Sequence, residues 1–139
     1  MNTNVNEIDA AVAKVASDVL DKENGRLADM LEKREGDILL NPGAFLSLRG
    51  KGGTTLLHLA AAEGNMRVVT ALLDAGMSPD VASDCGVTPL MVAAAVQSEA
   101  VINILEDRGA NRGAVSALGL SPQSYFTLGG LLPSKVEKW

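Results

Sequence analysis

The stretch from Gly50 to Thr55 places a lysine among glycines and threonines, the residue types that cradle phosphate in nucleotide-binding loops. Such a loop needs Ser or Thr directly after its Gly-Lys pair, and a strand before it. Here Gly52 follows Lys51. We therefore interpret the stretch as a flexible turn that presents Lys51 to a partner, and we do not expect a nucleotide site.

Two other side chains could be reactive, and each is the only one of its kind in the chain: His58 and Cys85. A histidine without a spaced partner residue makes neither a metal site nor a catalytic triad. No basic residue stands near Cys85 in the sequence, and the neighbouring Asp84 disfavours a reactive thiolate. We expect no catalysis, cofactor, metal or small-molecule substrate. A small enzyme that uses His58 or Cys85 is the alternative.

The composition limits the kinds of partner. The 139 residues carry a formal net charge of −5 without a basic stripe, so binding to a phosphate backbone is not expected. A single cysteine excludes an internal disulfide and is compatible with a reducing compartment. The polar N-terminus lacks the features of a secretory signal, and no run of about 18 apolar residues occurs. These features predict a cytoplasmic protein that contacts neither nucleic acid nor membrane.

Hydrophobic spacing predicts helices before the glycine-rich stretch. Apolar residues recur at steps of three and four, as on one face of an amphipathic helix, at Val5, Ile8, Val12, Val15 and Val19. A second helix is expected over about 23–35, with Gly36 just past its end. Residues 37–49 contain Asn41-Pro42-Gly43 between apolar runs, and we interpret them as an inserted loop.

The region around His58 recurs along the chain. The stretch Gly53–Ala61 is followed 33 residues later by Gly86–Ala94, and another 33 residues later by a related stretch that begins at Gly119. Each copy is predicted to contain a turn and a short helix. A second helix carries Val68, Val69, Leu72 and Leu73 in one copy and Val101, Ile102 and Leu105 in the next. A unit this short cannot bury its own apolar face, so neighbouring units must stack.

The spacing Gly53-x-Thr55-x-Leu57-His58-x-Ala60-Ala61-x-x-Gly64, followed by Val68-Val69-x-x-Leu72-Leu73-x-x-Gly76, resembles the ankyrin repeat over about residues 50–126. The resemblance implies an all-α solenoid of stacked antiparallel helix pairs with protruding turns, and it implies that His58 ties its turn to a neighbouring one. We predict one domain over 1–139. It comprises N-terminal capping helices (1–36), the inserted loop (37–49), two repeats (50–82 and 83–115), a truncated capping repeat (116–130) and a tail (131–139).

The same resemblance implies a non-enzymatic module that binds another protein through its turn tips and the concave face of its first helices. Gln97 replaces the glycine found at Gly64, so we expect a binding role for residues 96–98. Trp139 has two possible roles, an anchor for a partner or a residue that folds back on the stack. The predicted partner-binding residues are Lys51, Gly52, Thr54, Ala62, Glu63, Asp84, Cys85, Val87, Ala95, Val96, Leu118, Leu120 and Trp139.

The function that we expect is stoichiometric binding by a small inhibitor or adaptor of the immunity, antitoxin or anti-defence type. The alternative is a scaffold subunit of a homo-oligomer or of a larger assembly, which would use the acidic N-terminal helices or the tail. The sequence does not identify the partner.

Overall fold

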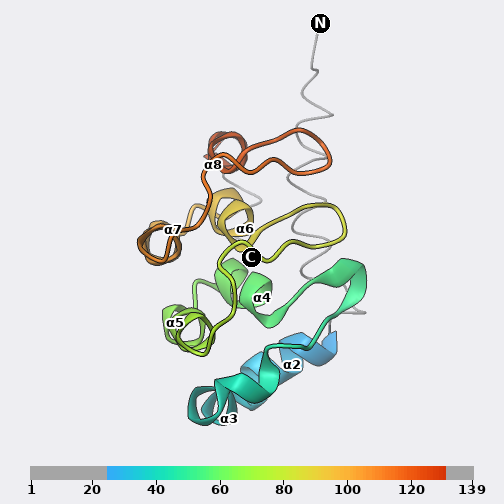
Figure 1. Cartoon of the computed structure of the whole chain (residues 1–139), viewed down its shortest axis with the longest axis vertical. Coiled ribbons are helices and arrows are strands. Elements are labelled where there is room, and N and C mark those ends of the chain that lie inside the picture. Colours follow the sequence, from blue (N-terminus) through green and yellow to red (C-terminus); the bar gives the residue numbers. More distant parts are fainter. Residues whose placement is uncertain (1–24, 131–139) are drawn as a thin grey trace, which may run out of the picture.

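A computed structural model of the chain describes residues 25–130, and this region consists of helices and loops without a β-strand (Figure 1). The predicted all-α repeat architecture is confirmed. The amphipathic helix expected around Val5–Val19 and the tail 131–139 lie outside the described residues.

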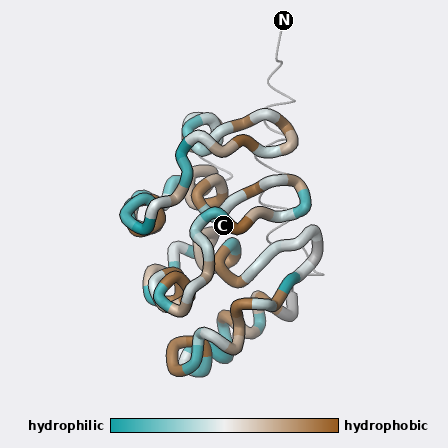
Figure 2. Tube along the Cα trace, in the orientation of Figure 1, coloured by the Kyte–Doolittle hydropathy of each residue, from teal (hydrophilic) through white to brown (hydrophobic). Residues whose placement is uncertain are grey.

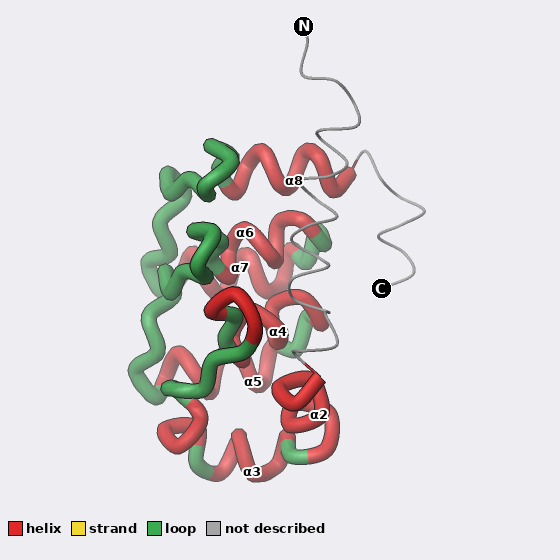
Figure 3. The backbone as a smooth tube through the Cα atoms, turned by 90° about the vertical axis from the view of Figure 1, so that its right-hand side faces the viewer, coloured by secondary structure: helices red, strands yellow, loops and turns green. Residues whose placement is uncertain are grey.

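The helices form two parallel columns (Figures 1 and 3). Within each column, consecutive helices contact one another, and α4 and α6 each also contact the helix that follows them. The first column contains α2 (Gly25–Lys33), α4 (Leu56–Glu63), α6 (Pro89–Ala95) and α8 (Pro122–Gly130). The second contains α3 (Glu35–Leu40), α5 (Met66–Asp74) and α7 (Glu99–Asp107).

Local sequence signals explain where these helices start and stop. The Thr55 side chain accepts a hydrogen bond from the backbone N–H of His58 and so caps α4, while Thr88 caps α6 through the N–H of Met91. Such caps satisfy N–H groups that have no partner within the helix. Gly64 ends α4 in the left-handed region, with a φ of 70°. A glycine adopts this conformation without a steric penalty, which lets the chain reverse into α5.

The core lies between the two columns. Its central helices, α4 and α6, are apolar almost throughout (Figure 2). Every residue of α6 is buried, as are residues 56–61 of α4. Alanines at 60, 61 and 93–95 let the first-column helices approach one another closely. The core positions predicted in the second helices are buried at Val68, Val69, Leu72, Leu73, Val101 and Leu105, whereas Ile102 is partly exposed.

The interpretation of residues 37–49 as an inserted loop was wrong, because they contain most of α3 and a 3₁₀ turn (Pro42–Phe45). The helix predicted over 23–35 ends at Lys33, and Gly36 lies inside α3. Helix α3 packs against α5 and α2 against α4, so residues 25–45 form a helix pair of the stack. The physical reason is the burial of Ile38 and Phe45, which supplies the packing that stabilises a helix of this length.

The truncated capping repeat (116–130) contains α8, which continues through Gly129 and Gly130. Gly129 lies against the carbonyl of Ala95, where a Cβ atom would overlap the carbonyl oxygen. The glycine therefore permits close packing of α8 on α6. Tyr125 and Leu128 are buried and close this end of the core, while Phe126 is only partly buried.

Candidate functional site

Three loops project from the helix columns, and we call them the finger loops: residues 50–54, 83–87 and 116–120 (Figure 1). Each loop is closed by a backbone hydrogen bond from its first to its last residue. The donor–acceptor distances are 2.7 Å for Gly50 to Thr54, 2.9 Å for Ser83 to Val87 and 3.0 Å for Ser116 to Leu120. The three loops thus repeat one backbone structure with the 33-residue period of the sequence.

Backbone hydrogen bonds also join the finger loops to one another. The N–H of Asp84 donates to the carbonyl of Gly52 at 2.7 Å, and the N–H of Ala117 donates to the carbonyl of Cys85 at 2.8 Å. Acceptors and donors occupy equivalent places in successive loops. The loop tips therefore form one connected row rather than three independent turns.

His58 connects α4 to the second finger loop, as the resemblance implied. Its Nδ1 accepts from the backbone N–H of Thr55 at 3.1 Å, which leaves the proton on Nε2 for donation to the carbonyl oxygen of Val87 at 2.7 Å. Burial is the main reason that the pKa of His58 falls from 6.5 to about 4, with a smaller contribution from the charge of Arg49. The imidazole is therefore neutral near pH 7, and both ring nitrogens are engaged, so its role is structural.

The structure divides the predicted partner-binding residues into three groups by exposure. Exposed residues are Gly52, Glu63, Asp84 and Leu118. Partly exposed residues are Ala62, Cys85, Val96 and Leu120. Buried residues are Thr54, Val87 and Ala95. Lys51 contributes its backbone to a 3₁₀ turn (Lys51–Gly53), and Trp139 lies outside the described residues.

The prediction that the side chains of the three buried residues contact a partner was wrong, because a partner cannot reach them. Thr54 and Val87 close the first and second finger loops, and the carbonyl of Val87 also accepts from His58. Ala95 is covered by α8 at Gly129. The sequence motif correctly identified these places in the repeat but could not show how closely the next unit packs on them.

Gln97 has a structural role that argues against the predicted binding role of residues 96–98. Its φ is 59°, so it adopts the left-handed conformation that Gly64 adopts in the preceding repeat. Its side-chain amide donates to the carbonyl of Phe126 at 2.9 Å. This bond holds α8 against the turn after α6, and no side chain at Gly64 could make it.

Two features were not predicted from the sequence: the exposure of Val115, and the acidic surroundings of Glu63, which is itself one of the predicted partner-binding residues. Val115 is 59% exposed beside the third finger loop, close in sequence to Leu118, which is 58% exposed. Glu63 is the last residue of α4. Partial burial is the main reason that its pKa is raised, and the neighbouring charges of Glu32 and Glu35 raise the pKa further. The apolar character of residue 115 was readable from the sequence, but its exposure was not.

Nothing in the described residues points to metal or membrane chemistry. Between residues 25 and 130, no three side chains of His, Cys, Asp or Glu gather in a way that could hold a metal ion. Over the same residues, no helix has the length and apolar character needed to cross a bilayer.

Comparison with protein families agrees with this geometry. A family model described as ankyrin repeats (3 copies) matches residues 33–114, which is more than half of the chain. Its match begins before the first clear sequence repeat and includes α3 and the last residue of α2. No curated protein matches the chain in a sequence comparison. Ankyrin repeats are a protein–protein interaction module, and this chain belongs to the ankyrin repeat family.

Proposed function

We propose that this protein acts by stoichiometric binding of another protein, as a small inhibitor or adaptor of the immunity, antitoxin or anti-defence type. The observation that carries the proposal is the row of finger-loop tips joined by backbone hydrogen bonds, with Gly52, Asp84 and Leu118 exposed along it.

The connected loops suit a binding surface because they are ordered before a partner arrives. Ordering a flexible loop on binding costs free energy, which lowers affinity. In this protein the bonds Gly52–Asp84 and Cys85–Ala117 have already restricted the loops. A partner would therefore bind a surface whose shape is established.

The chemistry of the tips changes along the row. The third loop and the residue before it offer the exposed apolar side chains of Leu118 and Val115, and the second loop offers the carboxylate of Asp84. Adjacent exposed apolar groups mark interaction sites, and a charge beside them favours one orientation of the partner. Glu63 at the end of α4 extends this surface toward the helices. We infer that the partner contributes an apolar patch with a basic group next to it.

A pull-down from native lysate with the full chain as bait, followed by affinity measurements on the captured protein, tests the proposal. The double variant Asp84→Lys/Leu118→Asp should weaken binding by at least tenfold and leave the thermal midpoint nearly unchanged. The matched control is Leu40→Asp, because Leu40 is 87% exposed in α3, away from the finger loops. Equal binding by the double variant and the wild type would show that the partner uses another surface.

The activity of the captured partner then separates the possible mechanisms. Loss of that activity on adding one equivalent of the protein supports inhibition, and unchanged activity supports an adaptor. Light scattering on the purified protein tests the scaffold alternative, which requires a stable oligomer.

A further inference from the structure

A shallow groove lies between α3 and α5 in the second column, and we call it the α3–α5 groove. Its volume is about 490 Å³. In its lining, Met66 is 49% exposed, and Leu40, which follows Leu39 in α3, is 87% exposed. Exposed apolar side chains that lie together mark interaction sites. The residues that line the groove are Leu39, Met66, Arg67, Thr70, Ala71 and Asp74.

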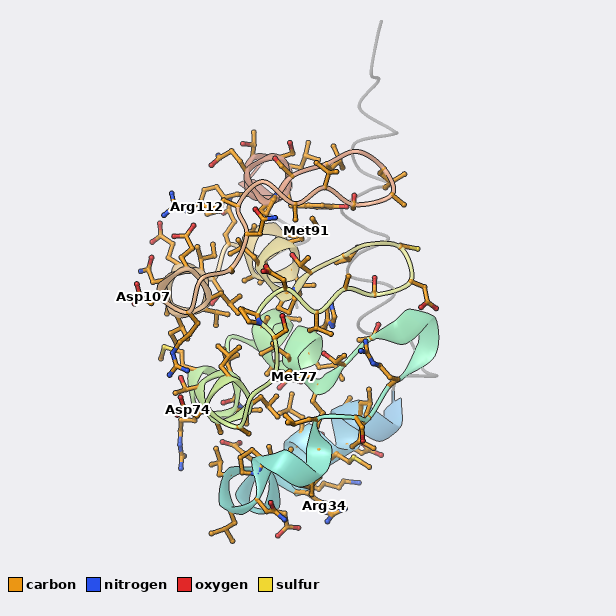
Figure 4. All side chains as sticks on the ribbon, viewed as in Figure 1. Arg34, Asp74, Met77, Met91, Asp107 and Arg112 are labelled. Carbon is orange, nitrogen blue, oxygen red and sulfur yellow. The ribbon has the colours of Figure 1, made fainter. Side chains whose placement is uncertain are left out.

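The outer face of α5 carries opposite charges at its two ends. Arg67, Thr70, Ala71 and Asp74 are spaced so that they lie on one face of the helix. The two charged side chains are well exposed, 77% for Arg67 and 61% for Asp74, and Figure 4 shows Asp74 on the side of α5 that faces away from the first column. The side chains between them are small, so another helix can approach this face closely.

This order of charges is self-complementary. Arg67 and Asp74 lie equally far along the chain from the midpoint between Thr70 and Ala71. When two copies of α5 pack antiparallel about a twofold axis through this midpoint, Arg67 of each copy lies opposite Asp74 of the other. One surface thus supplies both members of each ion pair, as a symmetric dimer interface requires.

We propose that a second copy of this chain occupies the α3–α5 groove, in a symmetric dimer with antiparallel α5 helices. Ion pairs within each chain extend the complementarity, because Arg67 lies 4.0 Å from Glu35 and Asp74 lies 2.7 Å from Arg108. Each end of the interface then holds charges of alternating sign, with Glu35 and Arg67 of one copy followed by Asp74 and Arg108 of the other. Such networks stabilise more than isolated surface pairs do.

Within residues 25–130, the pair of opposite charges is specific to α5 among the second-column helices. The equivalent positions one period earlier hold Arg34 and Asn41, and those one period later hold Ala100 and Asp107. Antiparallel pairing of α7 with itself would therefore place Ala100 opposite Asp107 and form no ion pair there. The charges favour a twofold axis at α5.

The dimer leaves the finger loops free. These loops project from the molecule on the side opposite α5 (Figure 1). In the symmetric dimer the two rows of loop tips point away from one another, so self-association and partner binding do not compete. The dimer would present two partner-binding surfaces, and its formation is independent of the partner binding proposed above.

Sedimentation equilibrium on the full chain, without any partner, measures the dissociation constant of the dimer. The variants Arg67→Asp and Asp74→Arg each place like charges opposite one another at both ends of the interface, so each should raise the constant roughly tenfold or more. An equimolar mixture of the two variants should recover most of the lost affinity, because every charge then lies opposite its counterpart. The matched control is Asp107→Arg, the same change one period later on α7, which should leave the constant nearly unchanged.

The two variants change the net charge in opposite directions, so weaker association of both cannot come from the net charge. Thermal unfolding confirms the fold of each variant, since the exchanged side chains are exposed. A wild-type protein that is still a monomer at about 1 mM, where even a weak dimer forms, would overturn the proposal. So would a dimer that persists in both single variants, a mixture that recovers no affinity, or an equal loss in Asp107→Arg.

Discussion

The Nε2 atom of His58 donates a hydrogen bond to the carbonyl oxygen of Val87 at 2.7 Å, across a sequence separation of 29 residues. This bond joins the first helix of one repeat to the finger loop of the next. Its donor and acceptor are both buried. The contact between the two repeats therefore depends on a specific hydrogen bond as well as on apolar packing.

Substitution of His58 by Met should lower the free energy of unfolding by about 3 kcal/mol. It leaves the buried Thr55 N–H without its acceptor, and it removes one of the two hydrogen bonds that the Val87 carbonyl accepts, while the bond from the Ser83 N–H remains. Methionine is the informative replacement because Met91, one period later, is fully buried. Urea unfolding measures the effect. Met91→Leu is the control, and its expected cost is below about 1.5 kcal/mol because it conserves apolar volume. Equal losses in the two variants would contradict a specific role for the hydrogen bonds.

The pKa of His58 also predicts a dependence of stability on pH. In the folded protein the pKa is lowered to about 4, whereas the unfolded chain protonates at the ordinary value of 6.5. Between these values the unfolded state binds more protons, so stability is present above pH 6.5 and is lost as the pH falls toward 4. This lowering of the pKa corresponds to a contribution of about 3 kcal/mol to the free energy of unfolding.

The measurement is the difference between wild type and His58→Met in unfolding free energy from pH 7.5 to 4. Because His58 is the only histidine, this difference isolates its titration. Glu63, whose raised pKa gives a dependence of opposite sign, is present in both proteins and cancels. A difference that does not change with pH would refute the assignment of a buried neutral imidazole.

Gly129→Ala should destabilise the protein by about 3 kcal/mol, near the upper end for overpacking, because the added methyl group would overlap the backbone carbonyl of Ala95. Gly36→Ala is a matched control within α3. No atom lies within 4 Å of the added Cβ at Gly36, so the substitution should stabilise by roughly 0.5–1 kcal/mol. Thermal unfolding of the two variants should shift the midpoint in opposite directions, and a shift in the same direction would contradict the close packing of α8 on α6.

Gln97 offers a test of how one residue combines backbone strain with a stabilising contact. Gln97→Ala should lower the unfolding free energy by about 1 kcal/mol, because it loses the bond to the Phe126 carbonyl and retains the left-handed backbone. Gln97→Gly should be close to neutral, because relief of about 1 kcal/mol of strain offsets the lost bond. The measurement is chemical denaturation of both variants. A glycine variant no more stable than the alanine variant would exclude strain at this position.

The 33-residue period determined the repeat architecture from the sequence alone. It located the helices that start after Thr55 and Thr88, because capping groups and apolar spacing act within one or two turns of chain. The expectation that His58 ties its turn to a neighbouring one came from the resemblance to the ankyrin repeat. The same local information explains why the predicted core residues Val68 and Leu72 are buried. Exposure of Asp84 and Leu118 at loop tips also followed from their place in the motif.

The other features of the fold depend on contacts between repeat units. These contacts join side chains that are distant in sequence, so only the tertiary structure shows them. Helix α3 is stabilised by packing against α5. Because its short sequence carries little helix signal of its own, we interpreted most of it as a loop. Gly129 continues a helix because it fits against Ala95, and Gln97 tolerates a positive φ because Phe126 lies within reach of its side chain. Contacts between units also explain why Thr54, Val87 and Ala95 are buried and cannot contact a partner through their side chains. Only the stacked structure shows which repeat positions the next unit covers.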